Sequence, residues 1–143
     1  MSSRRRDLGA AFTRLARAMV ELELPILRGH GLEMWDYVVL NQLAEGPAPT
    51  QGDLAAAIGR DPTRLIPSLD RLEQNGLLQR LVDPADRRGR TVVLSATGRE
   101  LLAACKQDIA AAEQTMLAQI DPARRAVFVE VLDQLASAPD PRR

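Results

Sequence analysis

Residues 50–76, TQGDLAAAIGRDPTRLIPSLDRLEQNG, carry the pattern that decides the fold. Thr50 followed three residues later by Asp53 is a capping-box pattern, which opens a short helix. Asp61-Pro62 is typical of the cap and first position of a second helix, and Asn75-Gly76 ends it. A helix, a short turn and a second helix predict a helix-turn-helix motif.

Two short strands are predicted directly after this motif. They cover Leu77–Val82 and Thr91–Ser95, and both are rich in apolar residues. The eight residues between them contain the proline, aspartates and glycine that favour a hairpin loop. The hairpin would form a wing beside the second helix.

The N-terminal region predicts two more helices. Apolar residues from Leu8 to Leu22 recur in steps of four and three, which indicates a helix with one apolar stripe. Pro25 either kinks or ends this helix, and residues 28–31, RGHG, are typical of its finish. A further helix runs from about Glu33 to Ala44.

Two C-terminal helices are also predicted. Thr97 and Glu100 form a second capping-box pattern that would open a long helix, and Asp121-Pro122 opens the last one. Because both ends of the chain carry apolar stripes, we favour a dimer seam over packing within one copy. The predicted seam residues are Leu8, Phe12, Leu15, Met19, Leu22, Val127, Phe128, Val131 and Leu135.

The composition narrows the possible functions. The chain has 143 residues with 19 basic and 19 acidic side chains, so an anionic partner must be met by a local patch. A single cysteine and a single histidine exclude a disulfide framework and structural zinc, and they leave no nucleophile and base for an enzyme. We therefore predict no cofactor and no metal. The absence of a long apolar run predicts a cytoplasmic protein that does not bind membranes.

Four stretches resemble, in order and spacing, those of the MarR family of winged helix-turn-helix regulators. They are residues 54–59 (LAAAIG), 69–78 (LDRLEQNGLL), 83–88 (DPADRR) and 94–101 (LSATGREL). The resemblance implies a mainly α fold with a small β-hairpin wing, formed by residues 1–143 as a single chain. A DNA-binding module would occupy 33–96, with dimerisation helices at 8–29 and 98–136. It also implies a homodimeric regulator, usually a repressor, that binds a pseudo-palindrome in double-stranded DNA and is often released by a small effector, commonly aromatic.

The second helix of the motif would enter the major groove. With the core leucines of this helix (Leu65, Leu69 and Leu72) turned inward, a rotation of about 100° per residue predicts its outward face. That face consists of Thr63, Pro67, Asp70 and Gln74, with Arg64 and Arg71 on its flanks. In the family the wing arginines enter the minor groove, and Asp86 resembles the acid that braces the wing. The predicted DNA contacts are Thr50, Gln51, Thr63, Arg64, Pro67, Ser68, Arg71, Arg87, Arg88 and Arg90.

Interpretations of these arginines that involve no DNA contact stay open. The wing arginines could be part of an ordinary solvated loop, and Arg64 and Arg71 could pair with nearby acids on an exposed helix. Pro67 departs from the family's commonest pattern, because an interior proline removes a backbone donor and costs about 3 kcal/mol in a helix. Either the helix bends around it or the groove accommodates its ring.

Candidates for regulation are few. His30 and Trp35 could line an effector cleft, although His30 could be a loop residue and Trp35 part of the core. Cys105 could act as an oxidation sensor, but its apolar helical stripe favours a buried and inert thiol. A protein-interaction adaptor without specific DNA binding is the alternative from another class, and the neutral net charge and Pro67 favour it.

Overall fold

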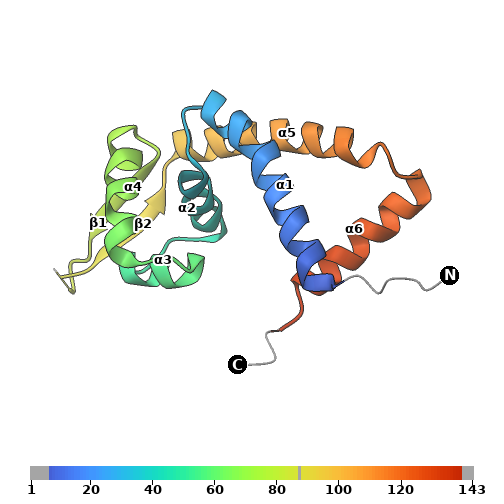
Figure 1. Ribbon diagram of the computed structural model, residues 1–143. Helices are drawn as coiled ribbons and strands as arrows, with labels where there is room; N and C mark the ends of the chain where they lie inside the picture. The colour runs from blue at the N-terminus through green and yellow to red at the C-terminus, as the bar shows by residue number, and fades with distance from the viewer. Residues whose placement is uncertain (1–6, 87, 140–143) are drawn as a thin grey trace. The chain divides into compact units, whose positions relative to one another are not determined.

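The computed structural model describes residues 7–86 and 88–139 of the chain. It contains six helices and a two-stranded antiparallel sheet within those residues (Figure 1). The chain forms two compact units, which meet in sequence between Ile109 and Ala110. Within the described ranges, no helix is both long and apolar enough to cross a membrane.

The first two helices confirm the N-terminal predictions. Helix α1 spans Leu8–Gly29 and is continuous through Pro25, and the Asp7 carboxylate caps it by accepting the backbone N–H of Gly9 at 2.9 Å. Helix α2 spans Met34–Glu45. Pro25 therefore lies inside the first helix rather than at its end.

The helix-turn-helix is present as predicted. Helix α3 spans Gln51–Ile58, and the Thr50 hydroxyl accepts the N–H of Asp53 at 3.0 Å. Gly59 follows with a φ of 68°, a left-handed conformation that glycine adopts without steric cost. Helix α4 spans Pro62–Gln74 and is capped by the Asp61 carboxylate. Pro67 lies in its interior without breaking it.

The wing is an antiparallel hairpin. Strand β1, Leu78–Val82, pairs with strand β2, Arg90–Leu94. Ala48 adds a bridge on the other side of β2, where it exchanges two backbone hydrogen bonds with Val92 at 2.9 and 3.0 Å. The wing is thereby anchored to the segment that precedes α3.

Helix α5 begins earlier than predicted. It spans Ala96–Leu117, so Thr97 lies inside its first turn and the predicted capping box of Thr97 and Glu100 is wrong. The cap is Ser95, whose hydroxyl accepts the N–H of Gly98 at 2.9 Å and donates to the carbonyl of Gly76 at 2.6 Å. Of these two hydrogen bonds, the first caps α5 and the second connects the start of α5 to the segment after α4.

Gly98 is required where α5 meets the start of the wing. It is buried, and a Cβ at this position would overlap the carbonyl oxygen of Leu77 and come within 2.8 Å of the Leu94 side chain. Only glycine allows the two backbones to approach this closely.

A single apolar core runs from the end of α1 to the middle of α5. It combines leucines of α2, α3 and α4 with residues of the wing and one face of α5. Its members are Leu27, Leu32, Val39, Leu40, Leu43, Ala48, Leu54, Ala55, Leu65, Leu69, Leu72, Leu77, Leu78, Val92, Leu102, Cys105 and Ile109. The core fixes α4 and the wing to one rigid base.

Helix α6 differs from this core. It spans Pro122–Ala136, is capped by Asp121, and buries none of its residues among the part of the chain that the structure describes. A helix of this length is marginal without a packing partner.

Candidate nucleic-acid interface

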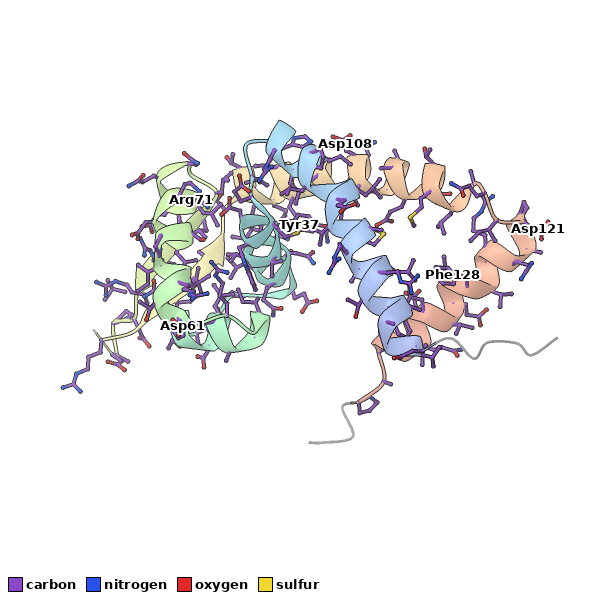
Figure 2. All side chains as sticks on the ribbon, viewed as in Figure 1. Tyr37, Asp61, Arg71, Asp108, Asp121 and Phe128 are labelled. Carbon is purple, nitrogen blue, oxygen red and sulfur yellow. The ribbon has the colours of Figure 1, made fainter. Side chains whose placement is uncertain are left out.

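Helix α4 turns one face to the core and the opposite face to solvent. Leu65, Leu69 and Leu72 are buried, as predicted. Thr63 and Pro67 are exposed. Figure 2 labels Asp61, which precedes the helix, and Arg71 in its later part. The helix therefore offers an exposed face about three turns long.

Ser68 lies on the wrong face for a DNA contact. It is only 7% exposed and stands between the core leucines, because it follows Leu65 by three residues and precedes Leu72 by four. A side chain buried there does not reach a base edge. The burial of Ser68 therefore contradicts its predicted contact with DNA.

Arg71 is tied to a buried acid that the sequence did not single out. One Arg71 guanidinium nitrogen donates to Oδ1 of Asp36, a residue that is 1% exposed. The other carboxylate oxygen of Asp36 accepts the N–H of Glu33 at 2.8 Å. Arg71 therefore pairs with an acid of α2 and not with one on its own helix. The bridge holds α4 against the first turn of α2.

Arg80 forms a second bridge, between α3, α4 and β1. Its guanidinium donates to Glu73 at 2.8 Å and to Gln51 at 3.2 Å, and it lies 2.6 Å from the Asp70 carboxylate. The Arg80 backbone N–H also donates to Glu73 at 2.8 Å. The side-chain and backbone hydrogen bonds from Arg80 lower the pKa of Glu73. Arg80 thus fixes the wing strand relative to the helix.

The start of α3 is occupied by local hydrogen bonds. The Thr50 hydroxyl donates to the Asp53 carboxylate at 2.9 Å in addition to capping the helix. Gln51 is half-buried, and its amide oxygen accepts from Arg80. Their predicted role as phosphate contacts stays a prediction.

The wing tip is organised by its aspartates. Asp86 accepts the N–H of Arg88 at 3.0 Å, and Asp83 accepts the N–H of Ala85 at 2.9 Å. Both are tight local turns in which the aspartate replaces a backbone acceptor. The side chains of Arg88 and Arg90 are exposed, whereas Arg87 lies outside the described residues. The loop therefore presents at least two guanidinium groups to solvent.

His30 and Trp35 each have a specific partner. Nε2 of His30 lies 2.7 Å from the Asp108 carboxylate of α5. Arg60 lies over the Trp35 ring, 4.2 Å from its centroid, which is a cation–π contact. Both rings are half-buried. In the described ranges, no cluster of three or more histidine, cysteine or acidic side chains is placed to hold a metal ion.

Cys105 is buried in the core. Its side chain has no exposed surface, and burial, together with the negative charge of Asp108, raises the pKa of the thiol. A thiol with a raised pKa carries little of the thiolate that reacts with oxidants. These surroundings favour an inert core residue.

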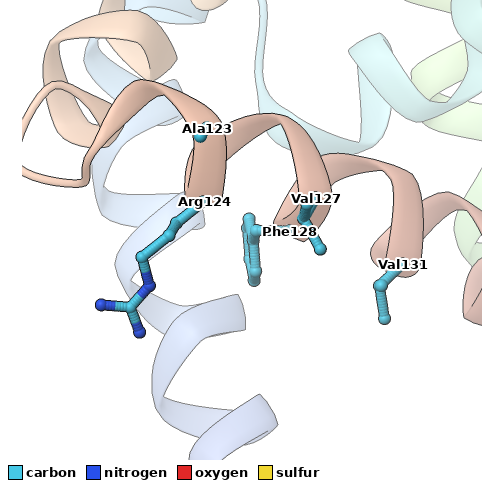
Figure 3. Close-up of a pocket in the computed structure, with 5 residues that line it drawn as sticks. All are labelled: Ala123, Arg124, Val127, Phe128 and Val131. Carbon is cyan, nitrogen blue, oxygen red and sulfur yellow. The ribbon is translucent and has the colours of Figure 1, made fainter.

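The predicted seam is exposed at both ends of the chain. Leu8, Phe12 and Leu15 of α1 are exposed, and Met19 and Leu22 are half-buried. On α6, the exposed apolar side chains form a shallow hollow with Arg124 at its rim, which Figure 3 shows in close-up. The exposed stripe of α6 consists of Val127, Phe128, Val131, Leu132 and Leu135.

The sequence did not reveal Asp36, Arg60 or Arg80 as members of this region. Each acts through a partner at least seven residues away in the chain, so helix and strand periodicity carries no signal for it. Arg80 could have been suspected from its position, since it is a charged residue in the middle of a short apolar strand.

Comparison with known proteins agrees with this architecture. Residues 32–89 match the model of the MarR family. The chain is 28% identical over 131 residues, 92% of its length and 75% of the relative, to a putative transcriptional regulatory protein for the hcr operon of Thauera aromatica.

Two solved structures of a transcriptional repressor, CouR, are also similar. One, bound to a 23-mer DNA duplex, is 27% identical with a TM-score of 0.76, covering 91% of this chain and 92% of that one. The other, from Rhodococcus jostii RHA1 and bound to p-coumaroyl-CoA, is 26% identical with a TM-score of 0.72, covering 98% and 99%. Residues 32–89, which include the helix-turn-helix, are therefore similar to the MarR family, whose members are DNA-binding transcriptional regulators and not enzymes.

Proposed function

We propose that the chain acts as a homodimeric repressor of a pseudo-palindromic operator in the cytoplasm. The observation that carries this proposal is the exposed face of α4 beside a wing that presents Arg88 and Arg90. Two copies of α4 would enter major grooves about one helical turn apart. The structure of CouR, a similar repressor, bound to a 23-mer DNA duplex supports binding to double-stranded DNA.

Each part of the surface has a separate task. The side chains of Thr63 and Arg64, exposed at the start of α4, would contact bases and phosphates, since the backbone N–H groups of both residues already donate to the Asp61 carboxylate. The wing arginines would enter the adjacent minor groove. Arg71 and Arg80 act mainly by holding α4 in position, since both are bound to acids of the same chain.

The helices at the chain ends would form the dimer, with 8–29 and 98–136 as its elements and 33–96 as the DNA-binding module. Burial of one large apolar side chain contributes about 1.5–3 kcal/mol. The stripe of α6, with Phe128 and Leu135, would therefore contribute favourably to association once a second copy covers it.

We also propose that a small aromatic effector releases the DNA. CouR binds p-coumaroyl-CoA, a thioester with an aromatic acyl group, which supports an aromatic ligand. Trp35 and His30 are the candidate contacts. Arg60 already lies on the Trp35 ring, so an anionic aromatic ligand would meet both a stacking surface and a cation there.

Selection of random duplex DNA with the purified protein tests the repressor proposal. We expect enrichment of a two-fold symmetric motif. Changing both Arg88 and Arg90 to Ala should weaken binding and lower the steepness of its salt dependence, since each lost phosphate contact reduces the slope by about one. Lys106→Ala, which removes an exposed charge outside the module, is the matched control.

Two results would contradict the proposal. A well-folded protein that enriches no motif at low salt would favour the protein-interaction adaptor. Enrichment of an asymmetric motif, with one copy bound per site, would contradict the homodimer while leaving DNA binding intact. An oxidant response that Cys105→Ser abolishes would support the alternative of a redox sensor.

A further inference from the structure

The centre of the exposed α4 face is apolar. Pro67 is exposed, and its neighbour Ile66 is 44% exposed. In the described residues between α2 and the end of β2, the other exposed large apolar side chains are Leu81 and Val82, both on β1. Ile66 and Pro67 are therefore the apolar pair that the recognition helix itself presents.

Stability does not explain this pair. An interior proline removes the hydrogen bond that its N–H would give to the carbonyl four residues earlier, here Thr63, and so destabilises a helix. An isoleucine that is nearly half exposed contributes less to the core than a buried one. A contact with DNA would give both residues a role that they do not have in the isolated chain.

Two polar side chains near the pair, on the following turn of α4, have partners in the same chain. Asp70, one turn after Pro67, lies 2.6 Å from Arg80. Arg71 donates to the buried Asp36. Pro67 itself has neither a backbone N–H nor a polar side chain. The helix can therefore offer the base pair opposite Pro67 an apolar surface, flanked by Thr63 at one side.

We propose that Ile66 and Pro67 recognise the 5-methyl group of a thymine in each operator half-site, an inference that rests on the proposed function. In the major groove, cytosine, adenine and guanine present hydrogen-bonding groups, and only thymine adds a methyl group. An apolar side chain without donors or acceptors favours that group and leaves the polar edges of other bases unpaired. Recognition by Ile66 and Pro67 would thus make the choice of base at this operator position depend on the thymine methyl group.

Replacing thymine by deoxyuridine removes this methyl group and leaves base pairing unchanged. On the selected operator, we expect one symmetric thymine position whose replacement weakens binding of the wild-type protein about fourfold per half-site, or about fifteenfold for both. In the double variant with I66A and P67A, thymine and uracil at that position should bind equally. P67A alone should reduce the discrimination in part, and alanine suits a helix, so both variants are expected to fold.

A control variant separates a specific contact from general apolar surface. L81A with V82A removes two exposed apolar side chains of β1 and should keep the full preference for thymine. If a symmetric operator is bound tightly but no thymine replacement matters, or if the preference persists in the double variant, the inference is wrong and the repressor proposal stands. If no symmetric operator is found, the repressor proposal itself fails.

Discussion

The module from the end of α1 to the middle of α5 and the helix α6 use apolar residues in opposite ways. In the module, Leu69 and Val39 have no exposed surface, and charged groups such as Asp36 have partners in the same chain. In α6, Leu135 is 62% exposed and no residue is buried among those described. The apolar side chains of the first region are covered within the chain, whereas those of α6 stay exposed. We therefore expect stability and assembly to depend on different parts of the sequence.

The largest expected effect is on the stability of the module from the end of α1 to the middle of α5. Gly98→Ala should destabilise the protein by about 4 kcal/mol or more, because the added Cβ would overlap the backbone of Leu77. Chemical denaturation measures this effect. Gly52→Ala is the matched control, since a Cβ there meets nothing closer than 3.6 Å and should stabilise α3 by about 1 kcal/mol. Equal effects of the two changes would contradict the close packing.

The next effect concerns α6 alone. Phe128→Asp together with Leu135→Asp should weaken dimerisation at least about a hundredfold, because two charges would have to be desolvated in the seam. Sedimentation analysis over a range of concentrations measures it, and the monomer should retain its helical content except in α6, which is marginal without a packing partner. Gln134→Asp places the same charge at a polar exposed position of α6 and should leave the dimer intact. If the double variant still forms the dimer, the dimer interface does not include this part of α6.

A smaller effect is expected from the bridge between α3, α4 and β1. Arg80→Gln should cost about 1–2 kcal/mol of stability, because Glu73 and Asp70 lose charge-assisted hydrogen bonds. It should also weaken DNA binding, since Asp70 on α4 would face the phosphates without its cation. Arg99→Gln, on the exposed part of α5, is the control for loss of charge. Unchanged stability of the Arg80 variant would show that the bridge does not hold the module together.

Glu73, one of the acids bound to Arg80, predicts that the stability of the protein depends on pH. Because the pKa of Glu73 is lower in the folded chain than its usual value of 4.5, its contribution to stability is complete above pH 4.5. That contribution is lost as the pH falls through the lowered folded-state pKa. Glu73→Gln should therefore reduce the slope of unfolding free energy against pH below 4.5. A slope identical to that of the wild-type chain would contradict the assignment.

The smallest effect is expected at Cys105. Because the thiol is buried and its pKa is raised, it should react with a disulfide reagent only at the rate at which the folded chain opens. Peroxide should leave DNA binding unchanged. A fast reaction of the native protein would show that this part of the core opens easily and would revive the redox alternative.

Local signals were sufficient for most of the fold. The caps at Thr50 and Asp61 and the stops after Ile58 and Gln74 place α3 and α4, because capping chemistry acts within a few residues. The same type of signal was misleading at Thr97. Ser95, two residues earlier, caps α5 because its hydroxyl can also donate to Gly76, a tertiary contact that a local pattern does not contain.

The site was less accessible to sequence reasoning than the fold. The rotation of α4 predicts its outward face, which requires only helical periodicity and a set of core leucines. The partner of Arg71 could not be chosen in this way, because Asp36 lies 35 residues earlier and reaches it only in the folded chain. The same reason hides Arg80, whose partners come from α3 and α4.

We propose that the DNA-binding module buries its core within one chain, whereas the helices that pair two copies leave their apolar residues exposed until the copies associate. The stoichiometry of the protein on its selected operator, measured by sedimentation of the complex, tests this claim most directly. Two copies on each two-fold symmetric duplex, falling to weak binding of single copies in the variant with Phe128→Asp and Leu135→Asp, is the predicted result. One wild-type copy bound tightly to an asymmetric site would contradict it.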